Sequence, residues 1–134
     1  MTADGLPILR LQHVSLPIPG SPEALDAARR FYGGILGLDE RPRPPALPGV
    51  GIWYAVADLE LHLFAEPSGV AANAASRRHP CFQVDDVTAL RSYLTAAGVT
   101  TFDDDGEITG RARFFAIDPF DNTIEFVQFA ADHW

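Results

Sequence analysis

The chain has 134 residues, of which 47% are hydrophobic and 21% charged, and its net charge is −8. This composition is typical of one globular domain with its own core, and the negative charge argues against a nucleic-acid partner, which requires a basic surface. One cysteine excludes an internal disulfide and favours the reducing cytoplasm. No apolar run reaches the roughly 20 residues of a membrane span, and the first residues lack the pattern of a signal peptide.

The first half of the chain predicts a strand, a helix and further strands. Ser21 is expected to cap the helix ahead of Pro22 and Glu23, and Gly33-Gly34 are expected to end it. Ala57-Asp58 form a tight turn between the last two strands. Strands are expected at residues 9–18, 52–56 and 59–64, with a loop or broken edge strand at 40–51, which holds four prolines.

The second half repeats this order after a linker-like stretch at residues 67–78. Asp85-Asp86 are expected to cap a helix that Gly98 ends, and the cluster 118–122 has the composition of a turn. Strands are expected at residues 81–84, 99–102, 113–117 and 123–129. The sequence therefore predicts a single α+β domain over residues 1–134, built from two modules (about 8–66 and 77–130) whose sheets form a shared, cupped half-barrel with flanking helices.

Three histidines and a glutamate occupy equivalent positions in the two halves. His13 and His62 are 49 positions apart, and His79 and Glu125 are 46 apart. Imidazole and carboxylate groups on paired strands are typical ligands of a divalent metal. Any one of these histidines could instead be a hydrogen-bonded structural residue, and the alternation around His62 also suits an exposed sheet face. Glu125 lies among aromatic residues, where a free carboxylate is costly. Because all four residues occupy equivalent positions in the two halves, a metal site is favoured over four separate structural roles.

Other residues are weaker candidates. Arg111 and Arg113 could clamp an anionic substrate or be solvated charges. Of the neighbours Trp53 and Tyr54, one is expected to line a cavity and the other to pack in the core. Cys81 shares the strand face of His79 but is by default a small packed residue. Serine-nucleophile, phosphate-loop and dinucleotide motifs are absent.

Four stretches carry a family resemblance that spans nearly the whole chain: LQHVSLPIP from Leu11, ARRFYGGILGL from Ala28, HPCFQVDDV from His79 and DPFDNTIEF from Asp118. Together they resemble the vicinal-oxygen-chelate superfamily, which includes glyoxalases, fosfomycin-resistance enzymes, bleomycin-resistance proteins and extradiol dioxygenases.

This resemblance implies two βαβββ modules around a metal-centred cup. The positions that match the three-ligand members are His13, His79 and Glu125. Glyoxalase-like members commonly have Glu or Gln where this chain has His62, so His62 is either a fourth ligand or a group beside the metal. Asp121 replaces the glycine usual in the final turn, at a position expected to require a positive φ.

The expected function is that of a metal-dependent enzyme of glyoxalase-like (lyase or isomerase) type. A divalent ion (Zn, Ni, Mn, Co or Fe) would act as a Lewis acid on adjacent oxygens of a small substrate, with Glu125 and His62 as catalytic candidates. A homodimer is expected, because symmetric dimers are common among short members. One alternative is a ring-cleaving dioxygenase, in which His62 would serve as the acid–base group, since the remaining histidine is His133. The other is a metal-free, drug-binding protein of the bleomycin-resistance type.

Overall fold

The computed structural model describes residues 9–66, 73, 76–104 and 106–131. The predicted linker therefore lies largely outside the described residues, as does His133. The first module contains β1 (His13–Ile18), α1 (Pro22–Ala28), η1 (Arg29–Ile35), β2 (Asp39–Arg41), β3 (Gly51–Val56) and β4 (Leu59–Ala65). The second contains β5 (Cys81–Gln83), α2 (Val87–Ala96), β6 (Thr101–Phe102), β7 (Arg111–Ile117) and β8 (Thr123–Phe129). This order confirms the predicted α+β fold of two βαβββ modules.

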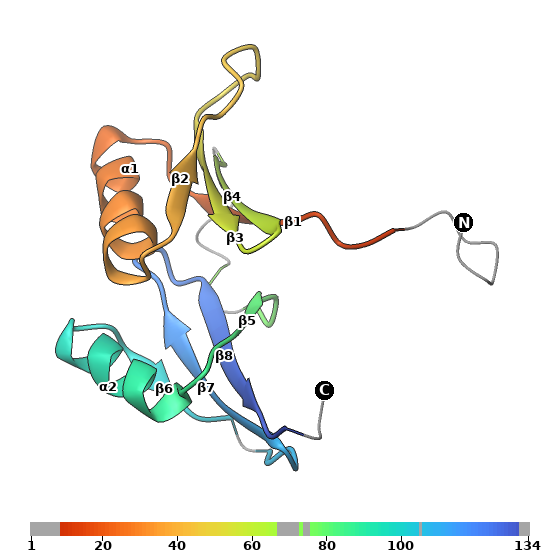
Figure 1. Cartoon of the computed structure of the whole chain (residues 1–134). Coiled ribbons are helices and arrows are strands. Elements are labelled where there is room, and N and C mark those ends of the chain that lie inside the picture. The colour runs from red at the N-terminus through yellow and green to blue at the C-terminus, as the bar shows by residue number, and fades with distance from the viewer. Residues whose placement is uncertain (1–8, 67–72, 74–75, 105, 132–134) are drawn as a thin grey trace.

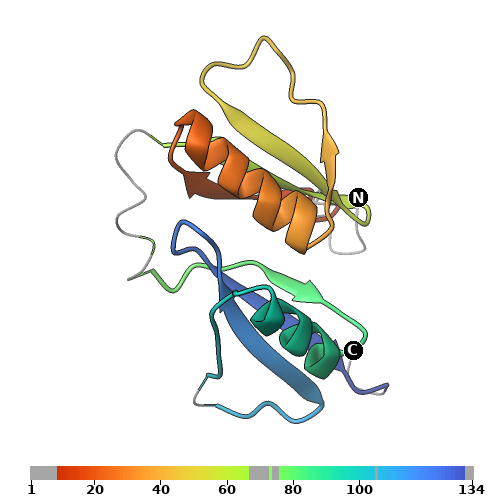
Figure 2. The same cartoon turned by 90° about the vertical axis from the view of Figure 1, so that its left-hand side faces the viewer.

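Each module forms its own four-stranded mixed sheet, with the orders β1-β4-β3-β2 and β5-β8-β7-β6. In each sheet the first and last strands of the module pair in parallel, and the remaining pairs are antiparallel. The sheets do not close into a barrel. The two modules lie one above the other, and both helical segments cover the same side of the molecule (Figures 1 and 2).

The strand registers show that the two halves are equivalent residue by residue. In the first sheet Ser15 pairs with His62, and in the second Cys81 pairs with Glu125. His13 lies two residues before Ser15, and His79 lies two residues before Cys81. The fold therefore makes His13 equivalent to His79, and His62 equivalent to Glu125. The internal repeat read from the sequence is thus a repeat of structure.

Helix starts follow the predicted capping residues. The Ser21 hydroxyl accepts a hydrogen bond from the Ala24 amide at 3.1 Å, and the Asp86 carboxylate accepts one from the Ala89 amide at 3.0 Å. Gly98 follows α2 at φ 84°, in the left-handed conformation that ends helices.

The predicted helix end at Gly33-Gly34 is wrong. The chain passes through both glycines as the π-helix η1, in which the Leu36 amide donates to the Phe31 carbonyl at 2.8 Å, and Gly37 at φ 71° then leaves the helix. Phe31 and Tyr32 are buried here, so core packing outweighs the low helix propensity of glycine.

The core is continuous between the modules and lies on the helix-covered faces of the sheets. Leu16, Leu61 and Tyr54 from the first module and Phe114 and Ile124 from the second are among its buried members. Tyr54 is fully buried and Trp53 is partly exposed on the opposite face, as predicted for these neighbours. Among the described residues, no helix is long and apolar enough to cross a membrane.

Candidate metal centre

The first pair of candidate ligands lies on the helix-free face of the first sheet. Strand β1 carries His13 and strand β4 carries His62, and their rings stack with centroids 4.1 Å apart. On the other side of His62 the indole of Trp53 stacks parallel to it, also at 4.1 Å. These three rings form a continuous aromatic row across β3, β4 and β1.

Polar partners fix both imidazoles of this row. The Nδ1 of His13 donates to the side-chain oxygen of Gln12 at 2.7 Å, which leaves the lone pair of the neutral ring on Nε2. The Nε2 of His62 donates to Glu60 at 2.9 Å. This hydrogen bond, followed by one from Gln12, lowers the pKa of Glu60.

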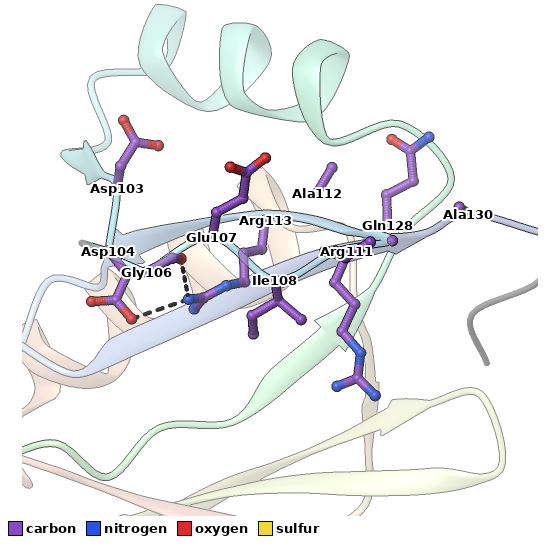
Figure 3. Close-up of a pocket in the computed structure, with 12 residues that line it drawn as sticks. Asp103, Asp104, Gly106, Glu107, Ile108, Arg111, Ala112, Arg113, Gln128 and Ala130 are labelled. Carbon is purple, nitrogen blue, oxygen red and sulfur yellow. Dashed lines mark hydrogen bonds and ion pairs between the residues drawn. The ribbon is translucent and has the colours of Figure 1, made fainter.

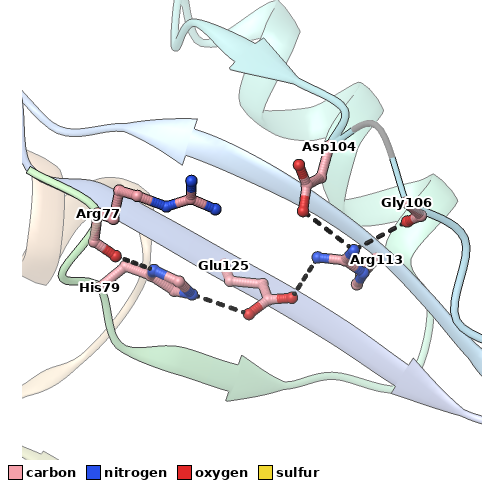
Figure 4. Close-up of polar contacts among 6 residues, drawn as sticks. All are labelled: Arg77, His79, Asp104, Gly106, Arg113 and Glu125. Carbon is pink, nitrogen blue, oxygen red and sulfur yellow. Dashed lines mark hydrogen bonds and ion pairs between the residues drawn. The ribbon is translucent and has the colours of Figure 1, made fainter. Parts of the chain in front are cut away.

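The second pair lies on the equivalent face of the second sheet (Figure 4). The Nε2 of His79 is 3.1 Å from Oε2 of Glu125, and the side chains are 31% and 13% exposed. The other oxygen of Glu125 accepts a hydrogen bond from Nη1 of Arg113 at 3.0 Å. Glu125 is therefore held from two sides, with a different group at each oxygen.

The His79–Glu125 contact calls for a positive charge between the two side chains. His79 Nδ1 contacts the Arg77 carbonyl at 2.8 Å, and because a carbonyl can only accept, Nδ1 carries a proton. A neutral ring then has its lone pair on Nε2, directed at a carboxylate oxygen, which is repulsive. Either a second proton or a metal ion resolves this repulsion, and an imidazole whose distal nitrogen donates to a backbone carbonyl is the usual arrangement of a metal ligand.

Cys81 lies beside this pair, as its strand position predicts. It is accessible to solvent, but the partial burial of its sulfur, followed by the negative charge of Glu125, raises the thiol pKa to about 12. A thiol with this pKa is almost entirely protonated at neutral pH and is a poor nucleophile.

Arg113 has a role that the sequence did not reveal. A substrate clamp would need a free guanidinium, but that of Arg113 contacts Glu125, Asp104 at 3.2 Å and the Gly106 carbonyl at 2.9 Å. Its neighbour on the same face, Arg111, lies over the Phe129 ring at 4.9 Å. The alternation of a strand places Arg113 on the face of Glu125, but only the β7–β8 register shows that it lies within reach.

A cavity of about 640 Å³ adjoins Arg113 (Figure 3). Residues 103–104 and 106–110 form one wall, and the ends of β7 and β8 form the other, with Arg111 and Gln128 among the lining residues. Neither His79 nor Glu125 lines this cavity, and Arg113 is the lining residue that contacts Glu125.

The four candidate ligands are divided between the modules. The contacts pair His13 with His62 and His79 with Glu125. Over the described part of the chain, no three His, Cys, Asp or Glu side chains come together in a group that could hold a metal ion. One chain thus presents two half-sites, which we define as the first (His13 and His62) and the second (His79 and Glu125). These donors are of the types that divalent metals accept, and a set of three would need donors from both half-sites.

Many solved structures resemble this chain, and three of them illustrate the range. A protein from Bacillus anthracis, described as a glyoxalase family member, is 32% identical, with a TM-score of 0.81 over 92% of this chain and 97% of that one. TnmS3, an antibiotic-binding protein from Streptomyces sp. CB03234, is 26% identical, with a TM-score of 0.71 over 93% and 99%. The fosfomycin-resistance protein FosX from Listeria monocytogenes shares the fold at 16% identity, with a TM-score of 0.74 over 94% and 95%.

No curated protein matches the sequence significantly. A family profile, in contrast, matches residues 10–126, which include both half-sites. The chain therefore belongs to the glyoxalase/bleomycin resistance protein/dioxygenase superfamily.

Proposed function

We propose that this chain is a metal-dependent enzyme of glyoxalase-like type, a lyase or isomerase that acts on a small substrate with adjacent oxygens. His13, His79 and Glu125 would hold a divalent ion. The observation that carries the proposal is the contact between His79 and Glu125, in which Nε2 and Oε2, two atoms that can ligate a metal, lie 3.1 Å apart. Metal dependence is common in the superfamily to which the chain belongs.

His62 would act beside the metal ion rather than as a ligand. Its ring is held between His13 and Trp53, and its Nε2 is bonded to Glu60. With Nε2 donating, a neutral His62 has its lone pair on Nδ1, where it can accept a proton from a substrate carbon or hydroxyl. Glu60 would stabilise the imidazolium that results.

The bound ion would supply Lewis-acid stabilisation of negative charge on a substrate oxygen. The protein contributes the orientation of its donors. Arg113 holds Oε1 of Glu125 and leaves Oε2 facing His79, so one carboxylate oxygen is directed at the ion position. Glu125 would thereby offer Oε2 to a metal ion while Arg113 holds Oε1.

A homodimer would complete the ligand set. Each chain offers two half-sites, and the donors of its described residues do not come together in a group of three. In a two-fold symmetric dimer, His13 of one copy would meet His79 and Glu125 of the other, and symmetry would create two identical sites. The small-molecule substrate would be the remaining partner. We place the protein in the cytoplasm, because its one cysteine suits a reducing compartment.

Metal binding by the purified protein tests this function. We expect about one divalent ion per chain after reconstitution with Ni, Zn, Mn, Co or Fe, as measured by elemental analysis and titration calorimetry. The double variant His79→Ala, Glu125→Ala should bind none, and His13→Ala should bind much more weakly. His62→Gln should retain the ion. Asp26→Asn, which removes an exposed carboxylate of α1, serves as the control.

A metal-free, antibiotic-binding protein is the second candidate. Two observations favour it: the 26% identity to the antibiotic-binding protein TnmS3, and the division of the four donors between two modules. If wild-type protein stays metal-free after reconstitution with all five ions, the proposal of a metal-dependent enzyme is rejected. The metal-free, antibiotic-binding protein is then the remaining candidate.

A further inference from the structure

A buried polar cluster lies outside the candidate metal centre. It consists of Tyr32 in η1 and Asp118 and Asn122 in the turn between β7 and β8, with exposed fractions of 0%, 4% and 5%. The Tyr32 hydroxyl donates to Oδ2 of Asp118 at 2.6 Å. Asn122 Nδ2 donates to the same oxygen at 2.9 Å and contacts the backbone carbonyl of Pro17 at 3.1 Å.

The bonds of this cluster join the two modules. Tyr32 and Pro17 belong to the first module, whereas Asp118 and Asn122 belong to the second. Pro17 is in β1, the strand that carries His13, and Asn122 directly precedes β8, the strand that carries Glu125. The cluster therefore connects the strand of one half-site to the strand of the other.

Asp118 is the centre of the cluster and has little freedom to move. Its Oδ1 accepts hydrogen bonds from the backbone amides of Phe120 and Asn122, both at 2.8 Å. Together with Tyr32 and the Asn122 side chain, four donors surround one buried carboxylate. A buried carboxylate that loses a donor is strongly disfavoured, so the cluster holds its three chain segments in one arrangement.

The turn itself does not need this cluster. The equivalent hairpin of the first module, between β3 and β4, turns at Ala57 and Asp58, both exposed, and Asp58 forms an ion pair with Arg10 at the surface. A two-residue connection is thus sufficient to join these strands. The longer, buried turn of the second module has an additional role, which its bonds to Tyr32 and Pro17 identify as contact between modules.

We propose that Tyr32, Asp118 and Asn122 are positioning residues that fix the angle between the two modules of a chain, so that both of its half-sites meet their complements in a second copy. This inference rests on the proposed function. In a symmetric dimer, one inter-module angle determines whether His13 reaches the His79–Glu125 pair at both sites. A displacement of about 1 Å at a reacting centre can cost on the order of 100-fold in rate. A small change in this angle would therefore lower activity even in a protein that folds normally.

Tyr32→Phe is the decisive variant, because it removes one hydroxyl and leaves the aromatic ring in the core. Tyr54→Phe is a matched control: Tyr54 is also fully buried, and its hydroxyl has no hydrogen-bond partner in the described structure. We expect Tyr32→Phe to weaken Co²⁺ binding at least tenfold, measured well below its unfolding temperature, and Tyr54→Phe to bind as the wild type does.

Combination with His13→Ala separates positioning from general damage. If Tyr32 acts by placing His13, Tyr32→Phe should not weaken Co²⁺ binding further once His13 is removed. A purely structural role would instead weaken binding by the same factor in both backgrounds. Equal factors, or an unchanged affinity in Tyr32→Phe alone, would overturn the proposal.

A distance measurement tests the geometry without any metal. Spin labels at Glu23→Cys and Thr95→Cys, exposed positions at α1 and α2, report the separation of the modules in a Cys81→Ser background. We expect Tyr32→Phe to shift or broaden this distance and Tyr54→Phe to leave it unchanged. Wild-type protein that binds none of the five ions would reject the proposed function. The labels would still decide the positioning role, which an unchanged distance in Tyr32→Phe contradicts.

Discussion

At the scale of single residues, the environment of Glu125 explains how a carboxylate is accommodated among aromatic rings. The sequence correctly indicated an apolar setting, since Phe115, which pairs with Glu125, and Val127 on the same strand face are both buried. The charge is balanced by Arg113 and by contact with His79. No pattern in the sequence distinguishes Arg113 from Arg111, because both lie on the same strand face two residues apart.

Arg113→Met tests the contribution of this neighbour. We expect it to weaken metal binding about 10- to 100-fold, the usual effect of losing a group that orients a ligand, because Glu125 loses its hydrogen bond at Oε1. Competition titration with a chelating dye measures the affinity. Arg111→Met is the control, since its guanidinium lies over Phe129 and away from Glu125. Equal losses in both variants would contradict the assigned role of Arg113.

At the scale of elements, two turns place ordinary residues in the left-handed region. Ala57 has φ 51° and Asp121 has φ 64°. The positive φ at Asp121 was predicted from its place in the final turn, where glycine is usual. The sequence predicted that Ala57 lies in a tight turn. It did not predict the positive φ, because alanine gives no indication of that conformation.

Glycine at either position should stabilise the fold. An L-residue in the left-handed region costs roughly 1–2 kcal/mol, so Ala57→Gly should raise the free energy of unfolding by about 1 kcal/mol after the entropy of glycine is subtracted. Asp121→Gly should give a smaller gain, because Asp tolerates this conformation better than Ala. Urea unfolding measures both, and a larger gain for Asp121→Gly would contradict this ranking.

Most of the remaining elements could be predicted because their signals are local. Ser21 and Asp86 cap helices through bonds to amides three residues away, and Gly98 ends α2 by its own conformation. The π-helix η1 could not be predicted, because it depends on burying Phe31 and Tyr32 against distant strands. Strand β1 likewise begins at His13 rather than residue 9, and Leu9 and Leu11 before it are 87% and 63% exposed.

At the scale of the whole molecule, the repeat predicted which residues are equivalent but not where the modules lie. The register of each sheet follows from local pairing, and it confirms the equivalence of His62 and Glu125. The angle between the sheets depends on the shared core and on bonds such as that of Tyr32 to Asp118, which join residues 86 positions apart. For this reason the sequence predicted one site that includes all four candidates, with His62 as a ligand or beside the metal, whereas in the described part of one chain the four lie in two separate pairs.

Mixing two inactive variants tests whether the site is shared between copies. His13→Ala lacks the first half-site, and Glu125→Ala lacks the second. If each site combines halves of two chains, a mixed dimer contains one intact site and one that lacks both ligands. Random reassociation of equal amounts makes half of the dimers mixed, so about a quarter of the wild-type sites should return. Co²⁺ titration after joint unfolding and refolding counts them. Refolding each variant alone gives the baseline, and a mixture that binds no more than this baseline would place all ligands of a site within one chain.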